Sequence, residues 1–133
     1  MQATSWIRRA SLAGLTVLTA VAMIAPTGAS AKAGDVIRRG NCTNNSVWKL
    51  KLSPENGRIE VEFEVDTPKI GKPWSVKMFQ NGTRFFVGTR TTQAPSGSFT
   101  VRFLRPNTVG PDTFKGKAVN LNSGEVCVGQ ATI

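Results

Sequence analysis

Four carboxylates share one face of a single predicted strand, and their spacing is compatible with acid–base chemistry. Glu60, Glu62, Glu64 and Asp66 alternate with apolar residues, so neighbouring carboxylates lie about 6.6–7 Å apart along an extended chain. That separation falls within the range that inverting glycosidases use for their acid and base. Acid catalysis also needs one carboxyl group whose pKa is raised by its surroundings, and a flat, solvated sheet face does not provide this. A hydrolase is therefore the third choice of function, after a polymer-binding module and a protein–protein module.

Histidine is absent from the 133-residue chain, which contains two cysteines and no tyrosine. Without an imidazole there is no Ser–His or Cys–His nucleophile pair and no histidine-ligated metal. Two cysteines are too few for a four-cysteine zinc site, and no glycine-rich phosphate loop is present. These absences favour a protein that binds rather than catalyses, and we expect no metal and no cofactor.

Seven runs of alternating apolar and polar residues follow Ser46, which is typical of half-buried β-strands. Turn sequences separate the runs, and the strongest of them is the hairpin signal Asn81-Gly82. The runs cover residues 48–52, 59–66, 74–79, 84–90, 99–104, 114–118 and 127–133. Their apolar positions predict a core between two sheets, formed by Trp48, Phe63, Trp74, Val76, Phe85, Phe99, Val101 and Phe114.

Seven short strands with regular turns predict an all-β antiparallel sandwich. The strand order, the Asn81-Gly82 hairpin and the inward-facing Trp74 resemble the immunoglobulin/fibronectin-III superfamily over roughly residues 36–133. The likeness is to its small secreted bacterial single-domain members, which have no assigned function. The chain lacks the tyrosine corner and the inter-sheet cysteine pair of antibody domains. The resemblance implies an immunoglobulin-like two-sheet fold and an extracellular location, but no reaction.

The resemblance also implies which strands lie beside the acidic one. It places the strand of Glu60–Asp66 between the first and fifth strands, whose outward residues include Lys49, Lys51 and Arg102. Opposite charges on neighbouring strands are an ordinary source of sheet stability. We therefore expect the carboxylates to form cross-strand ion pairs.

The other sheet would combine the third, fourth, sixth and seventh strands, whose outward residues include five cations and two phenylalanines but no acid. The two-residue loop Asn81-Gly82 predicts that Phe79 lies opposite Arg84 and that Lys77 lies opposite Phe86. Such neighbours either make cation–π contacts within the sheet or form a surface for a polyanion or a sugar. The predicted ligand-binding residues are Lys77, Phe79, Arg84, Phe86, Arg90, Lys115 and Lys117.

Residues 1–31 have the organisation of a secretory signal peptide. Arg8 and Arg9 precede an apolar stretch of about 16 residues, which is shorter than the roughly 20 needed to span a bilayer. Ala29-Ser30-Ala31 offers a small-residue cleavage site, so we expect the mature domain to span 32–133, with Gly34 as the second choice of start. Both the general secretory and the twin-arginine routes stay open. The expected product is secreted and has no integral membrane segment.

Export would place Cys42 and Cys127 in an oxidising compartment, where a single intramolecular disulfide is the pairing open to them. The chain has 17 Lys and Arg against 8 Asp and Glu, and removal of Arg8 and Arg9 would leave a net charge of +7. A charge of this size attracts anionic partners over long distances.

The leading functional interpretation is a secreted, monomeric, non-catalytic module that binds an anionic envelope polymer, a polysaccharide or nucleic acid. The alternative is a protein–protein module, such as an inhibitor or toxin-like factor, that acts through the loop 105–112. Polyanion binding should weaken as salt is added, whereas recognition of one protein through the loop should tolerate salt.

Overall fold

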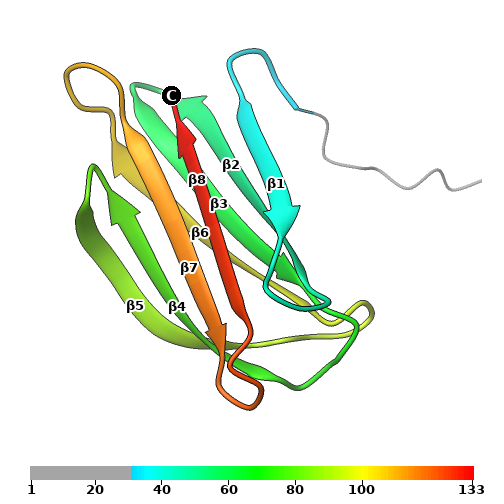
Figure 1. The fold of residues 1–133 in the computed structure, drawn as a ribbon. Helices are drawn as coiled ribbons and strands as arrows, with labels where there is room; N and C mark the ends of the chain where they lie inside the picture. Colours follow the sequence, from blue (N-terminus) through cyan, green and yellow to red (C-terminus); the bar gives the residue numbers. More distant parts are fainter. Residues whose placement is uncertain (1–30) are drawn as a thin grey trace, which may run out of the picture.

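The computed structural model describes residues 31–133, so the predicted signal peptide lies outside the described residues except for Ala31. This part of the chain forms eight strands and no helix (Figure 1). The strands are β1 (Val36–Asn41), β2 (Val47–Glu55), β3 (Arg58–Asp66), β4 (Pro73–Gln80), β5 (Thr83–Thr91), β6 (Ser98–Pro106), β7 (Thr113–Asn120) and β8 (Val126–Thr132).

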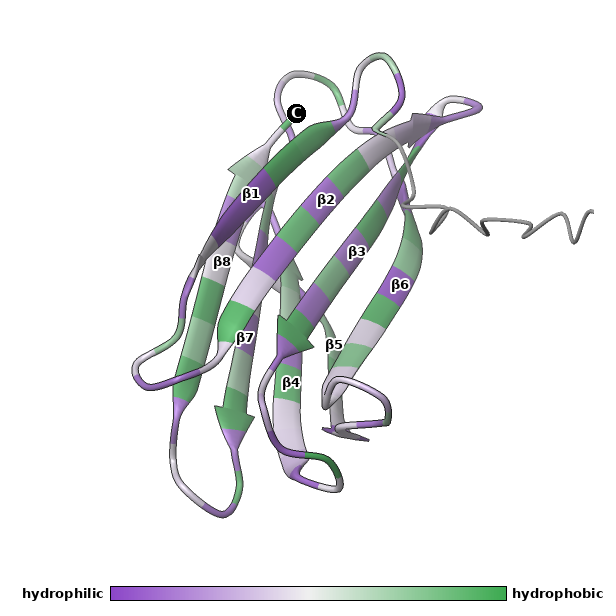
Figure 2. Cartoon of the chain, turned by 90° about the vertical axis from the view of Figure 1, so that its right-hand side faces the viewer, coloured by the Kyte–Doolittle hydropathy of each residue, from purple (hydrophilic) through white to green (hydrophobic). Residues whose placement is uncertain are grey.

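The strands form two four-stranded antiparallel sheets that face each other as a β-sandwich (Figure 1, Figure 2). One sheet has the order β1-β2-β3-β6 and the other has the order β5-β4-β7-β8. The acidic strand β3 lies between β2 and β6, as predicted. The predicted grouping of the four strands β4, β5, β7 and β8 is confirmed as well. The all-β sandwich is therefore the fold of this domain.

β1 is the one strand that the sequence analysis did not predict. All six of its residues pair with β2, at the edge of the sheet. Arg38 lies opposite the buried Leu50, on the inner side of the sheet, yet it remains exposed. A charge that points inward at a sheet edge discourages pairing with a second chain.

The inner faces of both sheets meet in one apolar core, which follows from the alternation of hydrophobic and hydrophilic residues along the strands (Figure 2). Trp48 and Phe85 pack against this core but are only partly buried. The remaining six predicted core residues are buried: Phe63, Trp74, Val76, Phe99, Val101 and Phe114.

Trp48 fits between the two sheets because a glycine stands on each side of its indole ring. A Cβ atom at Gly40 of β1 would lie 2.6 Å from the ring, and a Cβ atom at Gly129 of β8 would lie 2.5 Å from it. β1 and β8 are edge strands of the two sheets. The indole therefore fills the space between these edges, and a side chain at either glycine would displace it.

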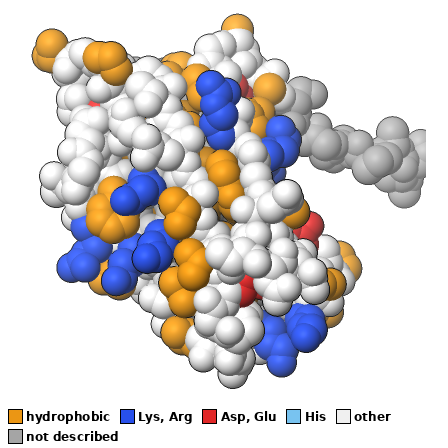
Figure 3. All heavy atoms as spheres, in the orientation of Figure 1, with side chains coloured by type: hydrophobic (Ala, Val, Ile, Leu, Met, Phe, Trp, Pro, Cys, Tyr) orange, Lys and Arg blue, Asp and Glu red, His pale blue; other side chains and the backbone are white. Residues whose placement is uncertain are grey.

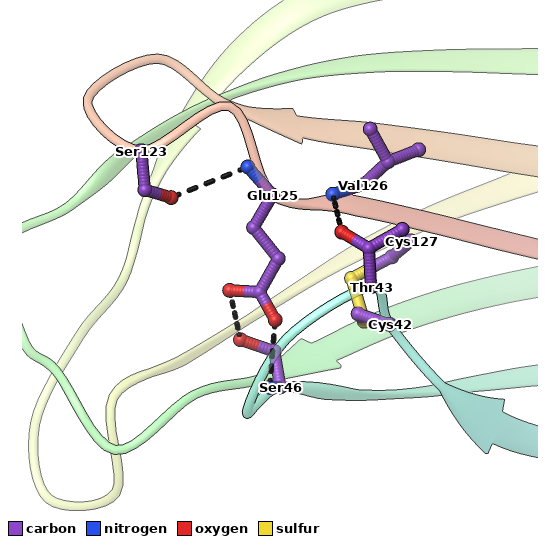
Figure 4. The surroundings of a disulfide bond; sticks show 7 residues. All are labelled: Cys42, Thr43, Ser46, Ser123, Glu125, Val126 and Cys127. Carbon is purple, nitrogen blue, oxygen red and sulfur yellow. Dashed lines mark hydrogen bonds between the residues drawn. A yellow bond between two sulfur atoms is a disulfide. The ribbon is translucent and has the colours of Figure 1, made fainter.

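A disulfide between Cys42 and Cys127 confirms the predicted pairing and joins the segment after β1 to β8 (Figure 4). The two Cα atoms are 4.3 Å apart although 85 positions separate the residues in the sequence. Beside the disulfide, Thr43 N donates to the Val126 carbonyl at 2.9 Å, and Val126 N donates to Thr43 Oγ1 at 3.0 Å. The buried Glu125 carboxylate accepts two more hydrogen bonds from the loop that precedes β2. The two sheets are thus tied together at this edge.

A β-bulge interrupts the pairing of β4 with β5. Phe79 lies opposite Arg84, as predicted, but the register then shifts between Met78 and Phe79. The predicted pairing of Lys77 with Phe86 is therefore wrong, because one extra residue is inserted in β5.

The bulge reverses the faces of β5 for the rest of the strand. Val87 takes the outward position that was predicted for Phe86. Phe86 and Arg90 lie opposite the buried Met78 and Trp74, which places both on the inner side of the sheet. Two of the predicted ligand-binding residues are thus on a different face from the other five.

Candidate functional site

The outer face of the β5-β4-β7-β8 sheet gathers five of the seven predicted ligand-binding residues. Cross-strand pairing arranges them in two adjacent rows over the middle of the sheet. Figure 3 shows Lys and Arg side chains collected among hydrophobic ones on this side of the molecule. These five residues form the basic face, which consists of Lys77 and Phe79 of β4, Arg84 of β5, and Lys115 and Lys117 of β7.

Exposed valines flank the lysines of the basic face. Lys77 lies opposite Lys117. In the same row, Val87 of β5 is the neighbour of Lys77 and Val128 of β8 is the neighbour of Lys117. The two valines are 54% and 46% exposed. The sequence analysis missed Val87 because the bulge that turns it outward was not predicted.

No acid compensates the cations of the basic face. Lys77 and Lys117 are directly opposite each other, an arrangement in which like charges destabilise a sheet. The ion pairs that residues 31–133 form all involve other cations, and none includes Lys77, Arg84, Lys115 or Lys117. The positive charge of this face is therefore open to an external anion.

The aromatic ring of the basic face is already engaged. Phe79 is half-buried, and the Nζ atom of Lys115 lies 4.8 Å from its ring centroid, which is a cation–π contact. Arg84 pairs with Phe79 from the other neighbouring strand. A base or a sugar would therefore have to displace Lys115 in order to stack on that side of the ring.

The two residues that the bulge turns inward cover the opening between the edge strands β5 and β6. The ring of Phe86 lies 4.8 Å from that of Phe103, and the Arg90 guanidinium lies 5.1 Å from the Phe86 centroid. The Arg105 guanidinium makes a similar cation–π contact, 4.2 Å from the centroid of the Phe85 ring. Phe86 and Arg90 therefore close an edge of the sandwich and do not belong to the basic face.

The acidic strand forms the cross-strand ion pairs that were expected. Lys49 Nζ lies 2.6 Å from Glu64 Oε2, while Arg102 lies 2.8 Å from Glu62 and 3.9 Å from Glu60. Within residues 31–133 no three His, Cys, Asp or Glu side chains lie close enough together to hold a metal ion. Three of the four carboxylates thus contribute to sheet electrostatics.

Lys51 departs from the expected pattern, since its ion-pair partner is Asp35 at 3.4 Å and not an acid of β3. Asp35 precedes β1 and also accepts hydrogen bonds from Ser53 Oγ and, at 2.9 Å, from the backbone N of Lys32. The Ser53 hydrogen bond is the largest influence on this carboxyl group; with the Lys32 and Lys51 contacts it outweighs desolvation and lowers the pKa of Asp35. Lys32 Nζ in turn pairs with Glu55. These contacts hold the start of the domain against β2.

The loop between β6 and β7 is held by one buried carboxylate. Asp112 accepts hydrogen bonds from Gln80 Nε2 and Asn81 Nδ2, both at 2.9 Å, and from Thr108 N and Oγ1, both at 2.8 Å. Burial opposes ionisation of Asp112, but these hydrogen bonds outweigh it and lower its pKa. Val109 is fully exposed at the tip of the loop. The network was not predicted, because its donors come from separate parts of the chain.

Comparison of the chain with known protein families, with proteins of known function and with solved structures finds no match. Among residues 31–133 there is no helix long and apolar enough to cross a membrane.

Proposed function

We propose that this chain is a secreted, non-catalytic β-sandwich of the immunoglobulin-like kind that binds linear anionic polymers through the basic face. The observation that carries the proposal is the direct opposition of Lys77 and Lys117 with no acid on their side of the sheet. Such a pair costs stability in the free protein, and an anion placed between the two ammonium groups would relieve the repulsion.

The state of the aromatic rings narrows the class of polymer. Stacking of a base on an aromatic side chain contributes about 1–3 kcal/mol in proteins that bind single-stranded nucleic acid. The ring of Phe79 is covered by Lys115, and Phe86 lies on the inner side of the sheet. The proposed ligand is therefore a flexible polymer with phosphate or carboxylate groups, recognised by charge, and not a single-stranded nucleic acid.

Two further observations support the remaining parts of the proposal. The Cys42–Cys127 disulfide is the kind of bond that persists in exported proteins, in agreement with the signal-peptide pattern of residues 1–31. The two antiparallel sheets that pack face to face around an inward Trp74 are compatible with an immunoglobulin-like sandwich.

The experiment compares two triple charge reversals with the same change in net charge. One variant carries Lys77→Glu, Arg84→Glu and Lys117→Glu, and the control carries Arg38→Glu, Arg58→Glu and Lys69→Glu at exposed positions elsewhere. Both are applied to a column of immobilised polyphosphate at low salt, where electrostatic attraction is weakly screened. We expect the first variant to lose retention and the control to keep most of it. Equal losses would mean that net charge alone acts, and would overturn the proposal.

A second comparison tests the class of polymer. Retention on polyphosphate and on oligothymidylate should fall with salt in the same way when charge alone is recognised. Much stronger retention on oligothymidylate, persisting at high salt, would show that bases contribute and would favour nucleic acid as the ligand.

The protein–protein alternative also has one specific observation in its favour. The buried Asp112 network fixes the loop that presents the exposed Val109, and a loop that is already ordered loses less entropy when it binds. In this alternative, a partner protein would bind in a salt-tolerant manner, and Val109→Asp would abolish that binding.

A further inference from the structure

The outer face of the other sheet contains a hollow of about 440 Å³ over β1, β2 and β3. This volume is within the range of small-molecule sites. Val47 forms its floor, because this short side chain lies between Asn41 and Asp66 in one row of cross-strand neighbours. The adjacent row holds the longer side chains of Arg39 and Lys49. The hollow forms because the short side chain of Val47 lies beside the longer side chains of Arg39 and Lys49.

The charges around the hollow are divided into one satisfied pair and two unpaired groups. Lys49 and Glu64 form an ion pair at 2.6 Å, so they neutralise each other. Arg39 and Asp66 also line the hollow, and within residues 31–133 neither side chain has a hydrogen-bond or ion-pair partner. The hollow thus presents one free positive group and one free negative group.

These two groups lie on opposite walls. Arg39 is on β1 and Asp66 is on β3, with β2 between them. Two strand spacings and one step of two residues along the strand put their Cα atoms about 12 Å apart. The two side chains can therefore contact opposite ends of one ligand that lies over Val47.

We propose that this hollow binds a short peptide with free termini. The guanidinium of Arg39 would bind the carboxylate, where it can donate two parallel hydrogen bonds, and the Asp66 carboxylate would accept hydrogen bonds from the ammonium group. The exposed Val47 supplies an apolar surface for the side chains between the two ends. The site is on the opposite sheet from the basic face and does not depend on the function proposed for that face.

The test is a titration of the ¹⁵N-labelled mature domain with Ala-Ala at millimolar concentrations, followed by NMR. We expect the amide signals of Gly40, Val47 and Asp66 to shift. Acetylation of the dipeptide's amino group or amidation of its carboxylate should each weaken binding about tenfold, which corresponds to the loss of a hydrogen bond to a charged group.

Variants of the protein complete the design. Arg39→Gln and Asp66→Asn should each weaken binding of Ala-Ala to the same extent, while Arg38→Gln, which changes the neighbouring cation on the inner side of β1, should leave it unchanged. Dispersed spectra of the free variants establish that each is folded. The proposal is overturned if Ala-Ala shifts no signal near the hollow. It is equally overturned if doubly blocked dipeptide binds as well as the free one, or if Arg39→Gln has no effect.

Discussion

Lys77 and Lys117 lie directly opposite each other on adjacent strands, and neither has an acidic neighbour on that face of the sheet. On the other sheet, Lys49 lies opposite Glu64, and the two side chains form an ion pair at 2.6 Å. The two sheets therefore use the same kind of cross-strand contact with opposite electrostatic results. One sheet carries cross-strand ion pairs, whereas the cations of the basic face on the other sheet have no acidic partner among the described residues.

This contrast predicts that stability and binding respond in opposite ways to one substitution. Lys77→Glu replaces a repulsive pair with an attractive one, so the free energy of unfolding should stay constant or rise by up to about 1 kcal/mol. Retention on polyphosphate should fall in the same variant. Lys49→Glu is the control, because it breaks an existing ion pair and should lower stability. Denaturant unfolding of the three proteins provides the measurement, and a less stable Lys77→Glu variant would contradict the prediction.

The buried carboxylate of the β6–β7 loop predicts a dependence of stability on pH. The folded-state pKa of Asp112 is lowered, so its stabilising contribution is complete above the ordinary carboxyl pKa of about 4 and is lost as the pH falls through the folded value. The wild type should therefore lose more stability between pH 5 and strongly acidic conditions than Asp112→Asn does. Thermal unfolding of both proteins over this range checks the prediction, and parallel curves would refute it.

The same network predicts a cost at neutral pH. Asp112→Ala leaves the donors of Gln80, Asn81 and Thr108 without their acceptor, and leaving a buried polar group unpaired costs about 1–3 kcal/mol. Asp66→Ala is a suitable control, because its carboxylate has no hydrogen-bond partner among the described residues. Unfolding in urea should show a large loss for the first variant and little change for the second.

The contacts of Lys32 bear on where the mature chain begins. Its backbone N donates to Asp35 at 2.9 Å, and its Nζ pairs with Glu55. Cleavage after Ala31 would turn that N into a charged ammonium group and strengthen the hydrogen bond to the carboxylate. We predict that secreted protein starts at Lys32, as judged by N-terminal sequencing. A start at Gly34 would remove both contacts and would count against this prediction.

The disulfide predicts a loss of stability on its removal. Replacing Cys42 and Cys127 together with serine should lower the free energy of unfolding by about 2–5 kcal/mol, since the bond closes a long loop. Calorimetry of the double variant and the wild type makes the comparison. An unchanged unfolding temperature would show that the hydrogen bonds beside the disulfide hold the two sheets together without it.

The alternation of apolar and polar residues predicted most of the sandwich, because most strands have one solvent-exposed and one buried face. Along β3 every second residue from Ile59 to Val65 is buried, and the residues between them are not. This regularity located the strands, whereas their assignment to sheets relied on the resemblance to the immunoglobulin/fibronectin-III superfamily. It fails for β1, where the sheet edge tolerates Arg38 on the inner side and Gly40 makes room for Trp48.

The errors at the candidate site have a physical cause as well. Phe85 and Phe86 are consecutive apolar residues, and strict alternation lets only one of them point inward. The bulge allows both rings to pack against the core and places Arg90 on the inner side as well. The burial of Asp112 could not be predicted either, because its hydrogen-bond partners Gln80 and Asn81 lie more than 30 positions away in the sequence.

The position of the disulfide determines how this domain would respond to a pulling force. Cys42 lies shortly after the first strand and Cys127 lies in the last one, so tension applied at the two ends passes through the sulfur–sulfur bond. The strands between the two cysteines bear none of it. Stretching could pull out only the segments outside the disulfide, residues 32–41 and 128–133, whose combined extended length is about 55 Å at about 3.3–3.6 Å per residue. A molecule tethered at both ends would therefore keep the basic face intact under tension.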